Sequence, residues 1–192
     1  KFDKEKEEQH QLRQEFLADI RADVRASLES IEIVDDDKLQ IGMSFDSFVI
    51  ERWERDRDVF VSAAKENGAD VYVQVADGDL EEQIEQIEYF IDKGVDAIVV
   101  IAVDCNGLSD VIDEVKAAGI TVVSYDRLIL NADVDLLVTF DNYKVGQLMG
   151  QSMVKNVQSM GKIVCINGSE SDHNVAEVRQ GFLDEVNKST LS

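Results

Sequence analysis

The sequence predicts an α/β fold in which a parallel sheet carries helices on both faces. From residue 39 onward, short apolar runs rich in β-branched residues alternate with longer amphipathic segments. One run, residues 97–103 (AIVVIAV), is apolar throughout, as is typical of a central parallel strand covered on both sides. The connections are short, and strand–helix–strand units of this kind close with right-handed crossovers.

The strands and helices follow one another from residue 39 to residue 125. Asn67–Gly68, Gly94 and Gly119 each end a helical pattern, as glycine commonly does. Asp79 offers a cap at the start of the second helix, with Glu82 as its capping-box partner. We therefore expect strands at 39–45, 69–76, 97–103 and 121–125, with helices at 50–67, 80–93 and 108–118 between them.

The second half is expected to begin another α/β domain. Residues 136–141 (LLVTFD) form a strand or a crossover, and a helix follows from Tyr143 to about Asn156. The apolar run 162–167 (KIVCIN) predicts a strand, with a helix starting near Asn174. One strand and one helix cannot bury a core, so this second domain is expected to be incomplete.

Residues 1–30 differ in composition from the rest and predict an amphipathic helix. Apolar side chains recur every three or four positions and share one helical face: Leu12, Phe16, Ile20, Val24, Leu28 and Ile31. Such a helix either packs on its own domain or serves as a stalk or partner helix outside it. The predicted organisation is a helix and linker at 1–38, a first lobe at 39–142 and the start of a second lobe at 143–192.

Charge and composition exclude several classes of function. A net charge of −21 repels nucleic acid and anionic lipid headgroups, so neither is an expected partner. No stretch approaches the roughly 20 apolar residues that span a membrane. Because the chain opens at Lys1 without a Met, we expect that an upstream piece has been removed.

The chemistry-bearing residues do not assemble into a known catalytic motif. The chain has no nucleophile elbow, HExxH, P-loop or GxGxxG sequence. Two cysteines supply neither a disulfide framework nor a four-ligand zinc site. Cys165 is expected to be a buried thiol and Cys105 to be partly exposed. No catalytic residue, metal site or cofactor is predicted.

Acidic residues follow the predicted strands. Ligands of open parallel sheets bind at the carboxyl ends of the strands, which share one rim. That rule brings together four aspartates, which form either a polar ligand site or solvated loops: Asp46, Asp77, Asp104 and Asp126.

Asp126 and Arg127 stand side by side directly after the strand 121–125. A carboxylate accepts hydrogen bonds from hydroxyls, and a guanidinium donates several in a fixed fork. The pair can therefore grip adjacent hydroxyls of a sugar, or form a local ion pair at a strand end.

Arg52 and Trp53 lie near the amino end of the first predicted helix and face the same rim. The indole, in the only Trp of the chain, can cover the C–H face of a sugar ring and donate one hydrogen bond. The alternative is a packing tryptophan.

Residues 168–174 (GSESDHN) join the strand 162–167 to the last helix. Backbone amides at a helix start can hold an anion, but Glu170 and Asp172 disfavour phosphate. Asp172 and Asn174 suit hydroxyl recognition instead. Ser171 or Asn174 can equally be a simple helix cap.

Three segments together resemble a known family: residues 41–60 (IGMSFDSFVIERWERDRDVF), residues 124–146 (SYDRLILNADVDLLVTFDNYKVG) and residues 166–174 (INGSESDHN). They resemble the periplasmic sugar-binding proteins of bacterial ABC importers, and within that group the D-xylose-binding proteins. The likeness runs from about Leu39 to Val186 nearly without gaps. The chain departs from the family's GSPxDNN loop at Glu170 and His173.

The resemblance implies two α/β domains that are joined by a hinge and close on a monosaccharide. Because the chain resembles the D-xylose-binding proteins most, the implied sugar is D-xylose. The ligand contacts at the matching positions are Arg52, Trp53, Asp126, Arg127, Asp172 and Asn174. It also implies an ABC permease as membrane partner and a periplasmic or extracellular location, with an anchor upstream of Lys1.

The predicted helix at 1–30 motivates a second hypothesis, a sugar-sensing subunit that signals to a membrane sensor histidine kinase. This helix is also suited to forming an oligomer or to pairing with a partner's helix. A DNA-binding repressor is disfavoured because residues 1–38 carry more acidic than basic side chains.

Overall fold

The computed structural model describes residues 38–157 and 162–189. Leu39–Ser192 forms one unit by its internal contacts and Lys1–Lys38 another. The helix predicted at 1–30 lies outside the described residues. Across the described ranges, no helix has the length and apolar character needed to cross a membrane.

The sheet confirms the predicted parallel α/β fold. Its five strands are all parallel and lie in the order β2-β1-β3-β4-β5. The strands are β1 (Gln40–Phe45), β2 (Asp70–Val75), β3 (Ala97–Val100), β4 (Thr121–Tyr125) and β5 (Leu136–Val138). The run 136–141, left open between strand and crossover, thus supplies a short edge strand.

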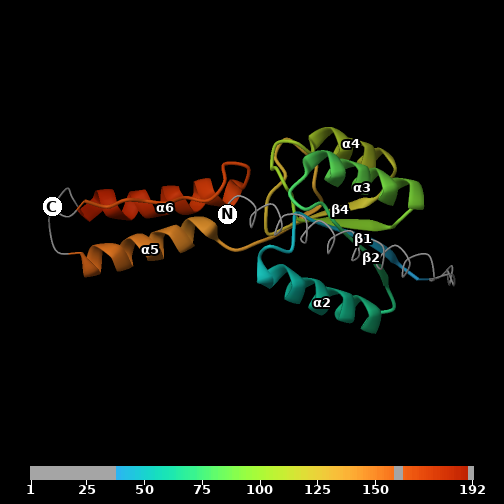
Figure 1. The fold of residues 1–192 in the computed structure, drawn as a ribbon, viewed down its shortest axis with the longest axis horizontal. Helices are drawn as coiled ribbons and strands as arrows, with labels where there is room; N and C mark the ends of the chain where they lie inside the picture. Colours follow the sequence, from blue (N-terminus) through green and yellow to red (C-terminus); the bar gives the residue numbers. More distant parts are fainter. Residues whose placement is uncertain (1–37, 158–161, 190–192) are drawn as a thin grey trace, which may run out of the picture. The chain divides into compact units, whose positions relative to one another are not determined.

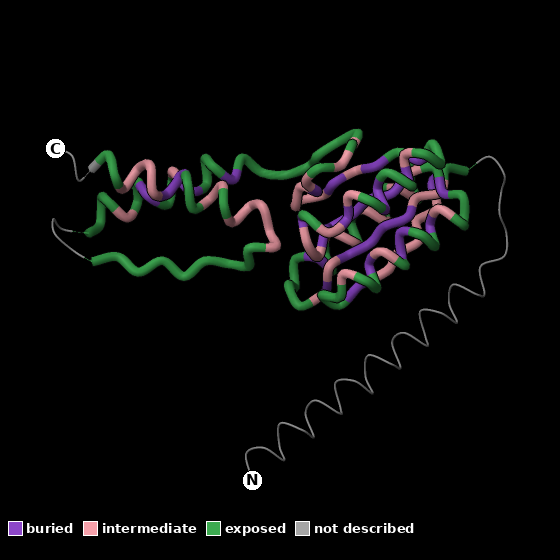
Figure 2. Tube along the Cα trace, turned by 90° about the horizontal axis from the view of Figure 1, so that it is seen from above, coloured by how far each residue is buried: buried purple, intermediate pink, exposed green. Residues whose placement is uncertain are grey.

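Helices cover both faces of this sheet (Figure 1). They are α2 (Glu51–Glu66) on one face, and α3 (Leu80–Lys93) and α4 (Ser109–Ala117) on the other. Successive side chains of β3 serve the two faces in turn, as strand geometry requires. Ile98 and Val100 belong to the core beneath α3 and α4, whereas Val99 belongs to the core beneath α2. Among the strands, the buried residues therefore lie on β1, β3 and β4, and Figure 2 shows the buried part of the chain.

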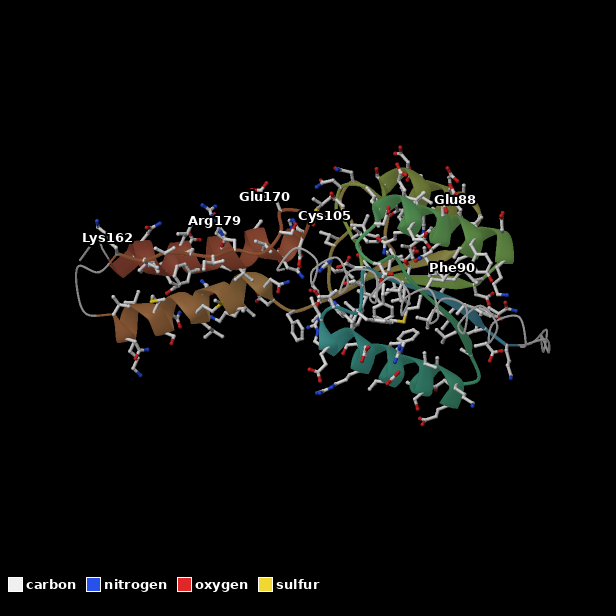
Figure 3. The ribbon with its side chains drawn as sticks, viewed as in Figure 1. Glu88, Phe90, Cys105, Lys162, Glu170 and Arg179 are labelled. Carbon is white, nitrogen blue, oxygen red and sulfur yellow. The ribbon has the colours of Figure 1, made fainter. Side chains whose placement is uncertain are left out.

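Gly42 allows α3 to lie close to the sheet. A Cβ atom at this position would stand 2.5 Å from the ring of Phe90, the buried aromatic residue of α3 labelled in Figure 3. The ring thus occupies the space that any larger side chain on β1 would need.

The ends of α3 follow the expected signals with one exception. The Asp79 side chain accepts hydrogen bonds from the backbone N–H groups of Glu81 and Glu82, and Gly94 ends the helix at a φ of 69°. The prediction that the Glu82 side chain accepts a hydrogen bond from the Asp79 N–H is wrong. The Asp79 N–H donates to the Ala76 carbonyl, and the Glu82 carboxylate accepts from Gln86 instead.

A buried polar network ties α3 to the carboxyl ends of the strands. Gln83 is fully buried; its Nε2 donates to the Ile101 carbonyl at 3.0 Å and its Oε1 accepts from the Val103 N–H at 2.8 Å. Gln83 Nε2 also donates to Ser44 Oγ, which donates to Gln86 Oε1, both at 3.1 Å. Each of these groups is satisfied, so the network fixes the backbone where the strands end.

Two further helices, α5 (Asn142–Asn156) and α6 (His173–Ser189), pack tightly against each other. Glycines allow the close approach: a Cβ on Gly146 would lie 2.0 Å from the Val178 carbonyl oxygen, and one on Gly181 would lie 2.0 Å from that of Tyr143.

The strand predicted at 162–167 is wrong. Residues 162–169 have no assigned strand and are exposed throughout (Figure 2). A strand needs a neighbour for its backbone hydrogen bonds, and none of the five sheet strands pairs with this segment. Apolar side chains such as Ile166, which is 96% exposed, are therefore uncovered in the described chain.

Both expectations for the cysteines are wrong. Cys165 is exposed because it lies in that unpaired segment. Cys105 is buried, and its backbone N–H and carbonyl bond Ser171 and Leu130 respectively. Burial raises the pKa of the Cys105 thiol, and the nearby Asp104 carboxylate adds to the rise.

Candidate functional site

The turn after β4 positions the Asp126–Arg127 pair at the carboxyl end of the sheet. Ser124 is fully buried; its Oγ donates to the Arg127 carbonyl at 2.7 Å and accepts from the Ile129 N–H. Asp126 adopts a left-handed backbone with φ 63°, which aspartate tolerates better than most residues. Its N–H donates to the Val138 carbonyl at the end of β5.

Asp126 is the meeting point of three elements. Its Oδ2 accepts a hydrogen bond from Arg52 Nη2 at the start of α2. Its Oδ1 accepts from Asn174 Nδ2 at 2.8 Å, and that Nδ2 is also 3.2 Å from the Asp126 carbonyl. The structure thus brings together three of the residues proposed for the site, namely Arg52, Asp126 and Asn174.

Arg127 lies beside this pair in a second cluster of charges. Its Nη1 donates to Asp46 Oδ2 and to the Ala102 carbonyl, both at 2.8 Å. Its Nε lies 3.3 Å from Asp172 Oδ2 but makes no hydrogen bond within the described chain. The positive charge of this largely buried guanidinium is therefore compensated by two carboxylates.

The helix cap that was considered at Ser171 or Asn174 lies at Asp172 instead. Asp172 accepts from the Asn174 backbone N–H at 3.0 Å, which is the capping interaction at the start of α6. The Asn174 side chain instead reaches Asp126.

Trp53 lies in the core beneath α2, with only 2% of its surface exposed. Its ring meets Phe45 and Tyr125 edge-on, and the Arg52 guanidinium stands 4.2 Å from its centre. The packing alternative describes this position. Its Nε1 has no hydrogen-bond partner among the described residues, which leaves one buried donor next to the cluster.

The four rim aspartates divide into two kinds. Asp46 and Asp126 belong to the clusters around Arg127 and Arg52. Asp104 accepts from the Asn106 N–H of its own loop, and Asp77 lies after the edge strand β2 with φ 53°.

Two residues of the site were missed by the sequence reasoning. Asp56 accepts from the Tyr125 hydroxyl at 3.1 Å and lies 3.7 Å from Arg52 Nε. Its place four residues after Arg52 is the available signal. Asn142 donates to Asn174 Oδ1 at 3.0 Å, and nothing in the sequence indicates that contact.

In this site, guanidinium and amide groups that donate hydrogen bonds alternate with carboxylates that accept them. Burial raises the pKa of the Tyr125 hydroxyl, and its hydrogen bond to Asp56 raises it further. The part of the chain that the structure describes contains no group of three or more His, Cys, Asp or Glu side chains able to hold a metal ion. Carboxylates, guanidinium groups and an amide arranged in this way can bind neighbouring hydroxyl groups.

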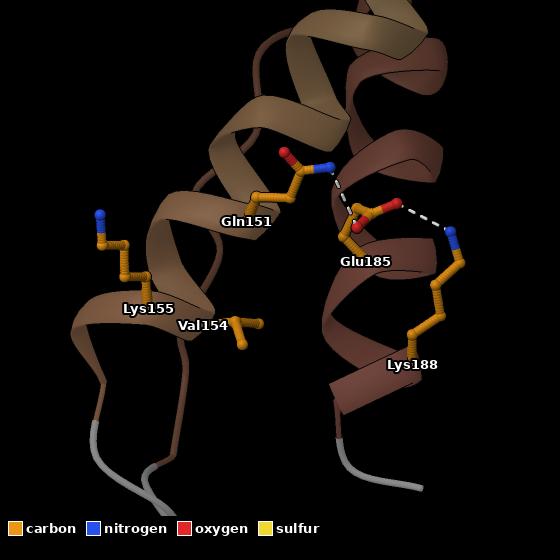
Figure 4. A pocket seen from close by; sticks show the side chains of 5 residues that line it. All are labelled: Gln151, Val154, Lys155, Glu185 and Lys188. Atoms are coloured by element: carbon orange, nitrogen blue, oxygen red, sulfur yellow. Dashed lines mark hydrogen bonds and ion pairs between the residues drawn. The ribbon is translucent and has the colours of Figure 1, made fainter. Parts of the chain in front are cut away.

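Two surface hollows lie away from these clusters, on the α5–α6 pair. One, of about 320 Å³, is lined by Gln151, Val154, Lys155, Glu185 and Lys188 (Figure 4). Within it Glu185 accepts from Lys188 at 2.7 Å and from Gln151 at 3.2 Å, and the Lys188 ammonium lowers the pKa of Glu185. The other hollow follows the exposed face of α5. Neither contains a predicted site residue.

Comparison with known proteins gives matches over most of the chain. Residues 41–191 match the model of the periplasmic binding protein domain, and residues 2–41 match that of a bacterial protein family of unknown function. The D-xylose-binding periplasmic protein of Haemophilus influenzae is 48% identical over 143 residues, which are 74% of this chain and 43% of the relative. That of Escherichia coli is 42% identical over 144 residues, 75% of this chain and 43% of the relative.

Comparison with solved structures also gives matches over most of the chain. An ABC transporter solute-binding protein of Clostridium phytofermentans with bound β-D-glucose superposes with a TM-score of 0.74 at 28% identity, over 78% of this chain and 48% of that one. The fructose-binding periplasmic domain of a hybrid two-component system gives 0.72 at 27% identity, over 78% and 52%.

The chain spans less than half the length of the curated relatives that it matches. Its parallel sheet with helices on both faces is the fold that it shares with them. The matched model covers well over half of the chain, and the chain therefore belongs to the periplasmic binding protein domain family.

Proposed function

We propose that this chain is the ligand-binding part of an extracytoplasmic protein that reversibly binds a monosaccharide, D-xylose, for import by an ABC transporter. The observation that carries the proposal is the cluster in which Asp126, Arg127, Asp172 and Asn174 converge at the carboxyl ends of the strands. The two relatives named as D-xylose-binding proteins support the choice of sugar.

The chemistry of the cluster suits a sugar. Each hydroxyl of a pyranose can donate one hydrogen bond and accept others, so it fits between a carboxylate and a guanidinium or amide. Here those groups pair with one another: Asp126 with Arg52 and Asn174, and Arg127 with Asp172. A bound sugar would exchange such pairs for bonds of similar strength to its own hydroxyls, which favours reversible binding. The sugar would be released chemically unchanged, as expected of a carrier and not of an enzyme.

The proposed partner is the permease of an ABC importer, and the proposed location is the periplasm or the cell exterior. The family match and the relatives' names support both. Anchoring upstream of Lys1 belongs to the same proposal.

A sugar-sensing subunit that signals to a membrane sensor kinase is the second candidate. It is favoured by one observation, the likeness to the periplasmic domain of a hybrid two-component system. In this version, closure of the two lobes around the sugar would be relayed to a partner through residues 1–30.

Calorimetric titration of the full-length protein with D-xylose, D-ribose and D-glucose tests the proposal. Tight binding of D-xylose, lost in Asp126→Asn but retained in the exposed Asp133→Asn, would support it. No heat with any of the three sugars would overturn it.

Deleting residues 1–30 separates the two roles. If the deletion leaves xylose uptake intact and abolishes a xylose-dependent signal, the protein is a sensor. Intact signalling with lost uptake would sink the sensing role.

A further inference from the structure

The first residue of α5, Asn142, makes contacts that the proposed sugar site does not by itself explain. Its side chain is buried, with 8% of the residue exposed. The adjacent Asp141 caps the helix, so Asn142 is not needed for that purpose. Instead Asn142 Nδ2 donates to Asn174 Oδ1 at 3.0 Å and to Thr139 Oγ1 at 3.3 Å.

The contact with Asn174 has a fixed polarity. The Asp126 side-chain Oδ1 and backbone carbonyl both accept from Asn174 Nδ2, so Asn174 turns its NH₂ group toward them. Its Oδ1 then faces the other way and needs a donor, which Asn142 supplies. With the Asn174 amide reversed, two NH₂ groups would oppose each other at one end, and oxygen would face oxygen at the other.

Asp126 in turn depends on the orientation of Asn174. One carboxylate oxygen is held by Arg52 and the other by Asn174 Nδ2. If Asn174 rotates, Asp126 loses one of these donors, and the direction in which its carboxylate can accept from a ligand is less well defined.

We infer that Asn142 is a positioning residue for sugar binding. It lies at the junction of β5 and α5 and holds the Asn174 amide in the one orientation that supports Asp126. The inference rests on the proposed function of the site, because its effect on affinity requires that a sugar binds there.

A change of polarity at constant size tests it. In the full-length protein, Asn142→Asp replaces a donor by an acceptor and favours the reversed Asn174 amide. Its affinity for D-xylose should fall by about tenfold or more, since the lost bond is replaced by an oxygen–oxygen contact. The matched control is Asn156→Asp, which makes the same change on the same helix at an exposed position, whose Nδ2 donates to the Ser152 carbonyl.

A double-mutant cycle separates positioning from general stability. Asn142→Ala should weaken xylose binding by about three- to tenfold in the wild-type background and have no further effect once Asn174→Ala is present. Equal, additive losses in both backgrounds would overturn the inference, because Asn142 would then act without Asn174.

An NMR measurement on the sugar-free protein tests this inference separately from the proposed function. The Asn174 side-chain amide gives a pair of NMR signals, assigned by their loss in Asn174→Asp. Asn142→Ala should shift them in the sugar-free protein, and Asn156→Asp should not. If the wild type binds none of the three sugars, the proposed function fails while these signals still decide the role of Asn142. Unshifted signals would overturn it.

Discussion

Arg127 donates to Asp46 at 2.8 Å and thereby joins the carboxyl end of β4 to that of β1, with β3 between them. The same Nη1 donates to the Ala102 carbonyl, just after β3, so one guanidinium spans three strands. A planar fork with fixed N–H directions can serve these acceptors and still face Asp172.

Arg127→Lys should therefore behave as a disruptive change. An ammonium group keeps the charge but cannot reach three acceptors in fixed directions, so xylose affinity should fall by about 1–3 kcal/mol. Arg127→Ala should lose at least as much, because it leaves Asp46 and Asp172 without their shared partner. Calorimetry measures both.

The control for these variants is Arg179→Lys, an exposed position on α6 labelled in Figure 3, which should leave affinity unchanged. Unchanged affinity in both Arg127→Ala and Asp126→Ala would remove the central claim about this site.

Asp56 is expected to control the ionisation of Tyr125. The Asp56 carboxylate accepts a hydrogen bond from the Tyr125 hydroxyl and opposes formation of a phenolate, and this adds to the effect of burial in raising the Tyr125 pKa. The stability that Tyr125 contributes is thus fully present below the ordinary tyrosine pKa of about 10 and is lost as pH rises through the folded value. Asp56→Asn should lower the Tyr125 pKa only part of the way, because burial remains.

Ultraviolet difference titration of the phenolate, compared with Tyr125→Phe, reports this shift. Asp58→Asn is the matched control on α2, since Asp58 pairs with Arg57 and with no other side chain among the described residues. A Tyr125 pKa that is the same in the wild type and Asp56→Asn would show that burial accounts for all of it.

Gln83 should matter for stability rather than for ligand binding. Gln83→Ala leaves the buried Ile101 carbonyl and Val103 N–H without a side-chain partner, which should lower the free energy of unfolding by about 1–3 kcal/mol. The exposed Gln180→Ala on α6 is the control. Chemical denaturation distinguishes the two, and equal midpoints would mean that water replaces the Gln83 amide at no cost.

Asp135 gives a prediction in acid. Its carboxylate accepts from the Lys116 ammonium and from the Val122 N–H, and these bonds lower the Asp135 pKa. A depressed carboxyl pKa stabilises the fold above the ordinary value of about 3.9 and loses that effect as pH falls through the folded value. The stability difference between wild type and Asp135→Asn should therefore be full at neutral pH and shrink below about pH 4.

The neighbouring exposed Asp133→Asn should show no such pH-dependent difference. Thermal unfolding across this pH range measures both variants. A constant difference for Asp135→Asn down to pH 2 would contradict the role given to its charge.

The sheet strands β1 to β4 and the helices between them could be predicted from local signals alone. Apolar runs, caps such as Asp79 and stops such as Gly94 act over a few residues, so they are visible in the sequence and recur in the structure. The rule that ligands bind at the rim formed by the carboxyl ends of parallel strands then predicted that Asp126 and Arg127 lie at that edge of the sheet.

What depends on distant partners could not be predicted in this way. The run 162–167 has the composition of a buried strand, but it pairs with none of the five strands and is exposed. The Gln83 network and the contact of Asn142 with Asn174 join residues 18 to 42 positions apart, and no local pattern marks them. Trp53 was assigned from its chemistry to a ligand, whereas its depth beneath α2 depends on the whole helix–sheet packing.

The glycines between α5 and α6 lead to the last prediction. Ala normally stabilises a helix relative to Gly by about 1 kcal/mol. At Gly181, however, a Cβ would lie 2.0 Å from the Tyr143 carbonyl oxygen, and at Gly146 equally close to that of Val178. Backbone atoms cannot move aside alone, so Gly146→Ala and Gly181→Ala should each separate the helices and cost about 1–3 kcal/mol in unfolding free energy.

Sugar binding should weaken with them, because α6 carries Asn174 to Asp126 and a shift of that helix lengthens their 2.8 Å bond. Ser152→Ala, on the exposed face of α5, should be neutral or slightly stabilising and is the control. Chemical denaturation and calorimetry on the same three variants separate the two effects. If both glycine variants are as stable as Ser152→Ala, the close approach of α5 and α6 contributes nothing to the free energy of unfolding. The position of Asn174 must then be set by its contacts with Asn142 and Asp126 and not by the packing of α6 on α5.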